Sequence, residues 1–86
     1  MTQLSPHFSL AEMTVTSTGI TNVPTGQHLK NLTYTAQQME KVRAILGGLP
    51  IQVNSGFRCD AVNRAVGGVT TSAHSFGFAV DFVCPA

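Results

Sequence analysis

The chain has 86 residues, of which 43% are hydrophobic and 10% are charged, and its formal net charge is +1. This composition excludes an intrinsically disordered chain, and the lack of a basic patch argues against nucleic acid as a partner. No apolar stretch approaches the roughly 20 residues of a membrane-spanning helix, and the N-terminus shows no secretory leader. We therefore expect one small domain, made in the cytoplasm, with no membrane partner.

The first 25 residues predict a short helical turn followed by a loop. Ser9 and Glu12 have the Ser-x-x-Glu spacing of a capping box, which favours a helix start at Ser9. Residues 14–25 are rich in Thr, Ser, Asn, Gly and Pro, which is typical of a loop.

Residues 26–46 predict one long amphipathic helix. Apolar side chains recur every three or four positions and form one stripe, made of Leu29, Leu32, Ala36, Met39, Val42 and Leu46. Thr33 and Thr35 are poor residues for the middle of a helix and predict a break or a second start. Gly47, Gly48 and Pro50 then end the helix.

The remaining residues predict two strands separated by a short helix. Residues 51–54 form the first strand, a helix starts at Cys59 or Asp60 and ends at residues 67–68, and residues 69–72 form a loop. The second strand covers residues 78–83. Its alternation predicts that Phe78, Val80 and Phe82 face the core and that Asp81 lies on the opposite face.

His74 and Asp81 are the two residues that suggest chemistry. They are seven positions apart, and a tight turn at Gly77 would bring a loop imidazole and a strand carboxylate together. Imidazole and carboxylate are usual zinc ligands, and a bound cation would offset the burial that we expect for Asp81. The alternative is a surface histidine beside an aspartate that caps a turn or pairs with Arg58 or Arg64.

A longer pattern surrounds this pair. It reads Ser72-x-His74-x-x-Gly77-x-Ala79-x-Asp81, and residues 55–58 upstream read Ser-Gly-Phe-Arg. Together they resemble the signature of the zinc D-alanyl-D-alanine carboxypeptidase family, which includes L-alanyl-D-glutamate endopeptidases of phage lysins. The segments "LSPHFSLAEM" and "NRAVGG" resemble the same group, so the likeness covers nearly the whole chain.

The resemblance implies an α+β fold in which one long and one or two short helices pack on a small, mostly antiparallel sheet. It implies a zinc-dependent hydrolase acting on peptidoglycan stem peptides, with Zn²⁺ held by His74 and Asp81. Arg58 would stabilise the oxyanion or bind a substrate carboxylate. Ser72 would contact the bound peptide and hold the segment that carries His74. Gly77 and Ala79 would leave space beside the metal.

Simpler roles remain open for several of these residues. Arg58 could pair with an acidic neighbour, and Ser72 could be an ordinary turn residue. His7 and His28 match no ligand position, and we expect them to be surface or packing residues. Cys59 and Cys84 would be free thiols or a disulfide near the site, and Cys59 would cap the short helix.

The family pattern also includes a third zinc ligand, a histidine, and a preceding acidic general base after the Asp81 strand, and neither occurs in this sequence. We therefore expect residues 1–86 to form one peptidase-like domain that is incomplete at its C-terminal end, and a homo-oligomer or a partner chain to cover the exposed apolar surface. Two functions follow as expectations: a peptidase acting at the cell wall or carried on a phage particle, and a non-catalytic structural or wall-binding module such as a virion or tail component.

Overall fold

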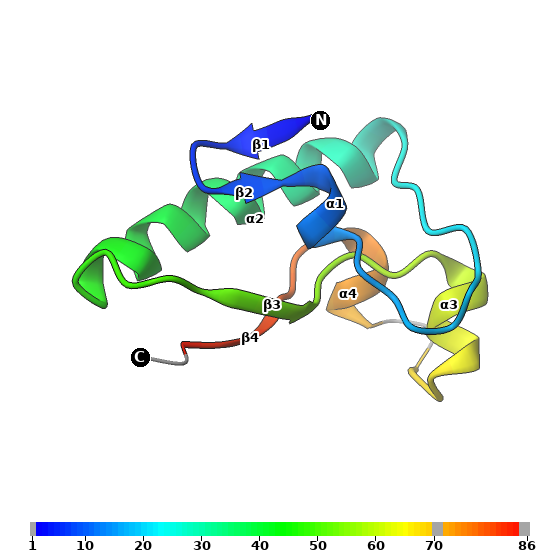
Figure 1. The fold of residues 1–86 in the computed structure, drawn as a ribbon. Coiled ribbons are helices and arrows are strands. Elements are labelled where there is room, and N and C mark those ends of the chain that lie inside the picture. The colour runs from blue at the N-terminus through cyan, green and yellow to red at the C-terminus, as the bar shows by residue number, and fades with distance from the viewer. Residues whose placement is uncertain (1, 70–71, 85–86) are drawn as a thin grey trace.

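The computed structural model of the chain describes residues 2–69 and 72–84 and has the predicted α+β architecture. Figure 1 shows one long helix, with a hairpin lying across it on one side and a second strand pair below. The elements in chain order are β1 (Gln3–Ser5), β2 (Phe8–Ser9), α1 (Leu10–Met13), α2 (Gly26–Ile45), β3 (Gln52–Ser55), α3 (Asp60–Ala65), α4 (Ala73–Phe76) and β4 (Asp81–Val83). No helix within the described residues is both long and apolar enough to span a membrane.

The strands form two separate antiparallel pairs, β1 with β2 and β3 with β4. In the second pair Val53 lies opposite Phe82, and Ser55 lies opposite Asp81, with a register shift between Val53 and Ser55. This pairing joins the strand that precedes Arg58 to the strand that begins at Asp81. The pairing therefore brings together the two halves of the sequence pattern.

Helix α1 begins at the predicted capping box. Ser9 Oγ accepts the backbone N–H of Glu12 at 3.1 Å, and Glu12 Oε1 accepts the backbone N–H of Ser9 at 3.2 Å. These two bonds satisfy donors that the first turn of a helix leaves free, which is why so short a helix forms here.

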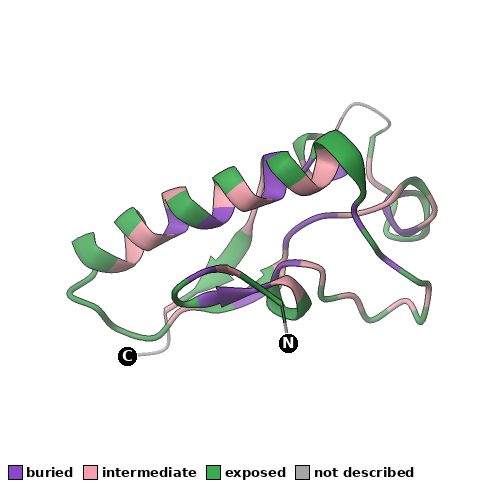
Figure 2. Ribbon diagram, turned by 90° about the horizontal axis from the view of Figure 1, so that it is seen from above, coloured by how far each residue is buried: buried purple, intermediate pink, exposed green. Residues whose placement is uncertain are grey.

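Helix α2 confirms most of the predicted apolar stripe and contains no break, but Leu46 lies just past its end and is 37% exposed. Leu32, Ala36 and Met39 are buried. Figure 2 shows the buried positions of this helix on the side that faces the rest of the chain. The hydroxyl of Thr33 donates to the carbonyl oxygen of Leu29 at 2.9 Å, and that of Thr35 donates to the carbonyl oxygen of Asn31 at 3.0 Å. Because these bonds use the helix's own backbone, the two threonines are accommodated and the predicted break is wrong.

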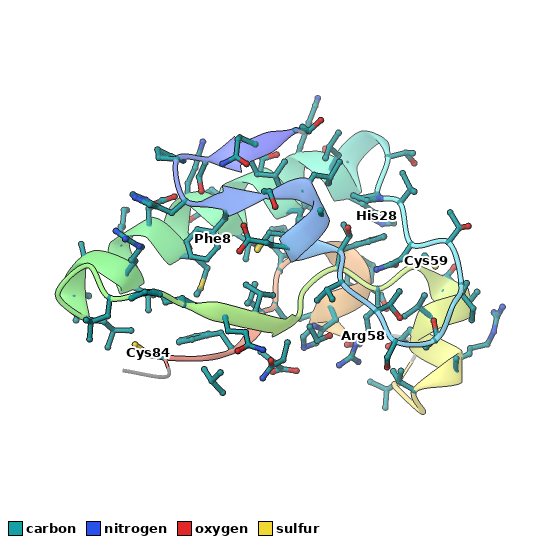
Figure 3. The ribbon with its side chains drawn as sticks, in the orientation of Figure 1. Phe8, His28, Arg58, Cys59 and Cys84 are labelled. Carbon is teal, nitrogen blue, oxygen red and sulfur yellow. The ribbon has the colours of Figure 1, made fainter. Side chains whose placement is uncertain are left out.

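The core lies where α2, the β1–β2 hairpin and β3 meet. Figure 3 shows Phe8 pointing into this space from the hairpin. The buried apolar side chains of this cluster are Phe8, Met13, Leu32, Ala36, Met39, Val53 and Phe57. Burial of side chains of this size contributes about 1.5–3 kcal/mol each relative to exposure, so this cluster is the main stabilising feature of the small domain.

The predicted core face of the last strand is wrong. Phe78 is 55% exposed and Phe82 is 38% exposed, and only Val80 packs partly against the core. The strand begins at Asp81 rather than at residue 78, so the alternation expected of a strand does not apply to residues 78–80. Strand β3, predicted at residues 51–54, lies one position later, at Gln52–Ser55.

Candidate functional site

His74 lies in helix α4 and not in a loop as predicted. Ser72 is the N-cap of this helix, and its Oγ accepts the backbone N–H of His74 at 3.2 Å. The hydroxyl therefore contacts the turn that carries the imidazole, while its contact with a substrate stays a prediction. Residues 70–71 of the predicted loop lie outside the described part of the chain.

Polar side chains of α2 hold the end of α4. The side-chain amide of Asn31 donates to the carbonyl oxygen of Phe76 at 2.8 Å, and the hydroxyl of Thr35 donates to the carbonyl oxygen of Gly77 at 2.6 Å. Gly77 has φ +87°, and a Cβ there would lie 2.8 Å from the carbonyl oxygen of His28. The space at Gly77 is thus used by the backbone of α2, while the expected role of this glycine beside a metal stays a prediction.

The imidazole of His74 has one nitrogen committed to the backbone and one free. Nδ1 lies 2.8 Å from the carbonyl oxygen of Gly56, which can only accept, so Nδ1 carries the proton of the neutral ring. Nε2 is then an acceptor, and it lies 3.5 Å from Oδ2 of Asp81. Metal-binding histidines are usually held in this way, with the second ring nitrogen donating to a carbonyl or carboxylate.

Asp81 is the first residue of β4, and its side chain is 62% exposed. The sequence predicted a buried carboxylate in need of compensation, and this prediction is wrong. The strand is short, and its start lies at the surface opposite Ser55, so the carboxylate remains hydrated. Its Oδ2 faces Nε2 of His74, which is an acceptor when the ring is neutral.

Arg58 completes the group and is largely covered, with 19% of its side chain exposed. Its Nη2 lies 3.8 Å from Oδ2 of Asp81, the same oxygen that faces His74. Its Nε donates to Ser55 Oγ at 3.2 Å, and Nη1 donates to Asn63 Oδ1 at 3.4 Å. Figure 3 shows Arg58 below the segment that joins β3 to α3, on the side of the molecule where β4 begins.

His74 and Asp81 fit a single divalent cation. Two protein ligands about 2.1 Å from a tetrahedral zinc ion lie about 3.4 Å apart, close to the 3.5 Å between Nε2 and Oδ2. A cation would also relieve the contact between two acceptors. Among residues 2–69 and 72–84, however, no group of three or more His, Cys, Asp or Glu side chains is placed to hold a metal ion. The described chain supplies two ligands of the three usual in catalytic zinc sites.

Among the described residues, the remaining histidines and both cysteines are not placed to bind a metal together with His74 and Asp81. His7 Nδ1 lies 2.7 Å from Glu40 Oε1 at the hairpin, and His28 packs between the rings of Phe57 and Phe76, as expected for surface and packing residues. The thiols are free, and Figure 3 shows Cys59 and Cys84 on opposite sides of the molecule. The disulfide considered from the sequence is therefore not formed. Cys59 occupies the N-cap of α3, but its side chain makes no capping bond.

Three residues that support the site were not found from the sequence. Ser55 and Asn63 orient the guanidinium of Arg58. The carbonyl oxygen of Gly56 orients His74, and a side chain at position 56 would overlap the carbonyl group of Met13. Ser55 and Gly56 do precede Arg58 in the sequence pattern. Their supporting hydrogen bonds could not be predicted from it, because those bonds depend on tertiary contacts.

Comparison with known proteins agrees with this arrangement of residues. A family model described as Peptidase M15 matches residues 6–86. A zinc D-Ala-D-Ala carboxypeptidase of Streptomyces albus G is 39% identical over 51 residues, which is 59% of this chain and 20% of that protein. The chain thus spans about a fifth of the length of this relative. Both matches confirm the resemblance predicted from residues 55–58 and 72–81.

Proposed function

Because the chain belongs to the peptidase M15 family, we propose that it is a zinc-dependent peptidase that cleaves peptidoglycan stem peptides, as a D,D-carboxypeptidase or an L,D-endopeptidase. One observation carries the proposal. His74 Nε2 and Arg58 Nη2 both lie within 3.8 Å of the same oxygen of Asp81, on three different elements of the fold. The similarity to a zinc D-Ala-D-Ala carboxypeptidase supports the zinc ion and the class of substrate.

In this proposal His74 and Asp81 hold the zinc ion. When bound, zinc acts as a Lewis acid toward a peptide carbonyl and makes water a stronger nucleophile. The hydrogen bond to Gly56 orients the ring and, in its neutral form, leaves the lone pair on Nε2 of His74, the nitrogen that would bind the metal. The fixed charge of Arg58 lies beside Asp81 and would stabilise negative charge that develops on the substrate oxygen.

The proposed enzyme needs a further ligand and a general base. Among the described residues no third His, Cys, Asp or Glu side chain is placed to bind a metal with His74 and Asp81. The acidic residue and the histidine that follow the Asp81 strand in the family pattern do not occur in this sequence. A second copy of the chain, a different chain, or sequence outside these 86 residues would have to provide them. We further propose that the enzyme acts at the cell wall, where its proposed substrate lies, or is carried on a phage particle.

A non-catalytic wall-binding or structural module is the second candidate. It is favoured by the two-ligand set, because two protein ligands bind zinc weakly and loss of a general base lowers rates by about 10²–10⁴-fold. Such a module would retain affinity for peptidoglycan or for other virion proteins. It would not hydrolyse the stem peptide.

Incubation of the zinc-loaded protein with purified peptidoglycan distinguishes the two candidates. We expect free D-alanine or new amino termini from the wild type and none from His74→Ala. His7→Ala is the matched control, because it removes an imidazole that contacts Glu40 and not Asp81. A wild type that sediments with peptidoglycan but releases no product would contradict the peptidase and support the binding module.

A further inference from the structure

Asn22 is a buried polar residue in the loop that joins α1 to α2, with 8% of its surface exposed. Figure 1 shows this loop passing the start of α3 on its way to α2. Apart from Pro24, the other residues of the loop are exposed or half-buried. A buried amide destabilises a fold unless its donors and its acceptor are hydrogen-bonded, so the burial of Asn22 within an open loop requires specific partners.

Those partners are all main-chain groups. Nδ2 of Asn22 donates to the carbonyl oxygens of Thr14 at 2.9 Å and of Phe57 at 2.7 Å. Its Oδ1 accepts the backbone N–H of Cys59 at 2.7 Å. Both N–H groups of the amide and one lone pair of its oxygen are thus used. Because Phe57 and Cys59 are the two neighbours of Arg58 in the chain, one side chain holds the main chain on both sides of the arginine.

Two further bonds hold the same turn. The backbone N–H of Phe57 donates to the carbonyl oxygen of Met13 at 2.8 Å, and that of Arg58 donates to the carbonyl oxygen of His74 at 3.0 Å. The turn is therefore bonded at residues 57, 58 and 59, and Asn22 makes two of these four bonds. Together they fix the backbone of Arg58 and hence the direction in which its side chain leaves the main chain.

A fixed main chain is important for Arg58 because its side chain is long and its own contacts are weak. The guanidinium lies 3.2 Å from Ser55 Oγ, 3.4 Å from Asn63 Oδ1 and 3.8 Å from Asp81 Oδ2. A group that stabilises a developing charge must be in place before the reaction, and a displacement of about 1 Å lowers rates by about 10²-fold. Contacts of this length leave much of the positioning to the main chain.

We propose that Asn22 is a positioning residue of the candidate active site, which holds the turn on both sides of Arg58 and thereby keeps the guanidinium beside Asp81. None of the side-chain hydrogen bonds of Asn22 goes to His74 or Asp81, so its effect passes through the turn that carries Arg58. The expected effect on rate rests on the proposed peptidase function, whereas the expected effect on the order of Arg58 does not.

The first test uses NMR of the full wild-type chain and requires no activity. The heteronuclear NOE of the Nε–H group of Arg58 should approach that of backbone amides, whereas that of Arg64, which is exposed, should be much lower. The backbone amide of Cys59 should exchange with water at least tenfold more slowly than that of Val23, which is 60% exposed in the same loop. A Cys59 amide that exchanges as fast as Val23 would overturn the proposal, even if no variant folds.

The same NOE is then measured in two variants. Asn22→Asp keeps the size of the side chain and the acceptor for Cys59, but places a carboxylate oxygen where the two donated bonds were. The NOE of Arg58 should fall by at least half. Ser5→Ala is the matched control, because it removes a buried hydrogen bond to Glu40 and leaves residues 57–59 untouched. An Arg58 NOE that is unchanged in Asn22→Asp would overturn the proposal.

The second test measures hydrolysis of a stem-peptide analogue at saturating zinc. Asn22→Asp should lower kcat at least tenfold with KM within about twofold, because the guanidinium acts on charge that develops during the reaction. Ser5→Ala should keep kcat within about twofold. A change in KM alone, or equal losses of kcat in the two variants, would overturn the positioning role. If the wild type releases no product, the proposed peptidase fails, and the order of Arg58 still decides the role of Asn22.

Discussion

The backbone N–H of Arg58 donates a hydrogen bond of 3.0 Å to the carbonyl oxygen of His74. The return contact comes from the imidazole of His74, whose Nδ1 donates to the carbonyl oxygen of Gly56. These two bonds join the segment that follows β3 to α4, so the main chain around Arg58 and the helix that carries His74 are held together. The side chains of Arg58 and His74 then meet at Asp81, which β-pairing with Ser55 places at the same edge.

Replacement of Arg58 by lysine tests whether its role depends on its geometry. Lysine keeps the positive charge but cannot donate to both Ser55 and Asn63 from a planar fork. If the proposed function holds, we expect kcat to fall by about 10²–10³-fold with little change in the free energy of unfolding. Arg64→Lys on the exposed face of α3 is the matched control. Equal rates for Arg58→Lys and wild type would show that the guanidinium is not needed.

Gly77 should be far less tolerant of alanine than Gly67. Both have a positive φ, +87° and +76°, so both lose about 1 kcal/mol or more from backbone strain. Only at Gly77 would the new Cβ meet the backbone of α2, 2.8 Å from the carbonyl oxygen of His28 and 3.0 Å from the amide nitrogen of Leu32.

We therefore expect Gly77→Ala to lower the free energy of unfolding by at least about 1–2 kcal/mol more than Gly67→Ala, as measured by urea denaturation. The same variant should also weaken metal binding, because α4 carries His74 and would be displaced. Equal destabilisation by the two alanines would contradict the close packing of α4 on α2.

Glu40 should make the fold sensitive to acid. Burial by itself raises the pKa of Glu40. Hydrogen bonds from Ser5 and His7, together with the charge of His7, lower the pKa by more than burial raises it, so the pKa lies below its ordinary value of 4.5. A carboxyl whose pKa is lower in the folded chain than in the unfolded chain stabilises the fold above pH 4.5, and this contribution is lost as the pH falls through the folded pKa.

Glu40→Gln should remove this contribution, since it breaks the contacts that anchor the hairpin to α2. We expect it to lower the free energy of unfolding by about 1 kcal/mol at pH 7 and to flatten the fall in stability as the pH drops below 4.5. Chemical denaturation at several pH values measures both effects. An unchanged slope in the variant would show that Glu40 is not the group responsible.

The sequence was sufficient for the elements that depend on local signals. The capping box at Ser9 and Glu12 was predicted correctly, because it depends on residues three positions apart. Most of the apolar stripe of α2 was also predicted correctly, because the helical repeat itself places these side chains on one face. The helix that carries His74 was missed, since α4 has only four residues and is held by Asn31 and Thr35 from a distant helix. Such tertiary contacts leave no periodic signal.

The sequence predicted which residues form the candidate site but not how exposed they are. His74, Asp81 and Arg58 meet as the sequence pattern indicated. The expected burial of Asp81 and the core positions of Phe78 and Phe82 were wrong, because the strand begins only at Asp81 and lies at the surface. A pattern of spaced residues fixes which side chains converge, whereas exposure depends on how much of the sheet covers them.

Zinc affinity of single-residue variants tests the central claim most directly. Competition with a chromogenic chelator at neutral pH should give one zinc ion per chain for the wild type and for the control His7→Ala, with an affinity below that of three-ligand sites. His74→Ala and Asp81→Ala should each weaken binding at least tenfold, because each removes one of the two ligands. Zinc affinity that is unchanged in both variants, or a wild type that binds no zinc, would contradict the account.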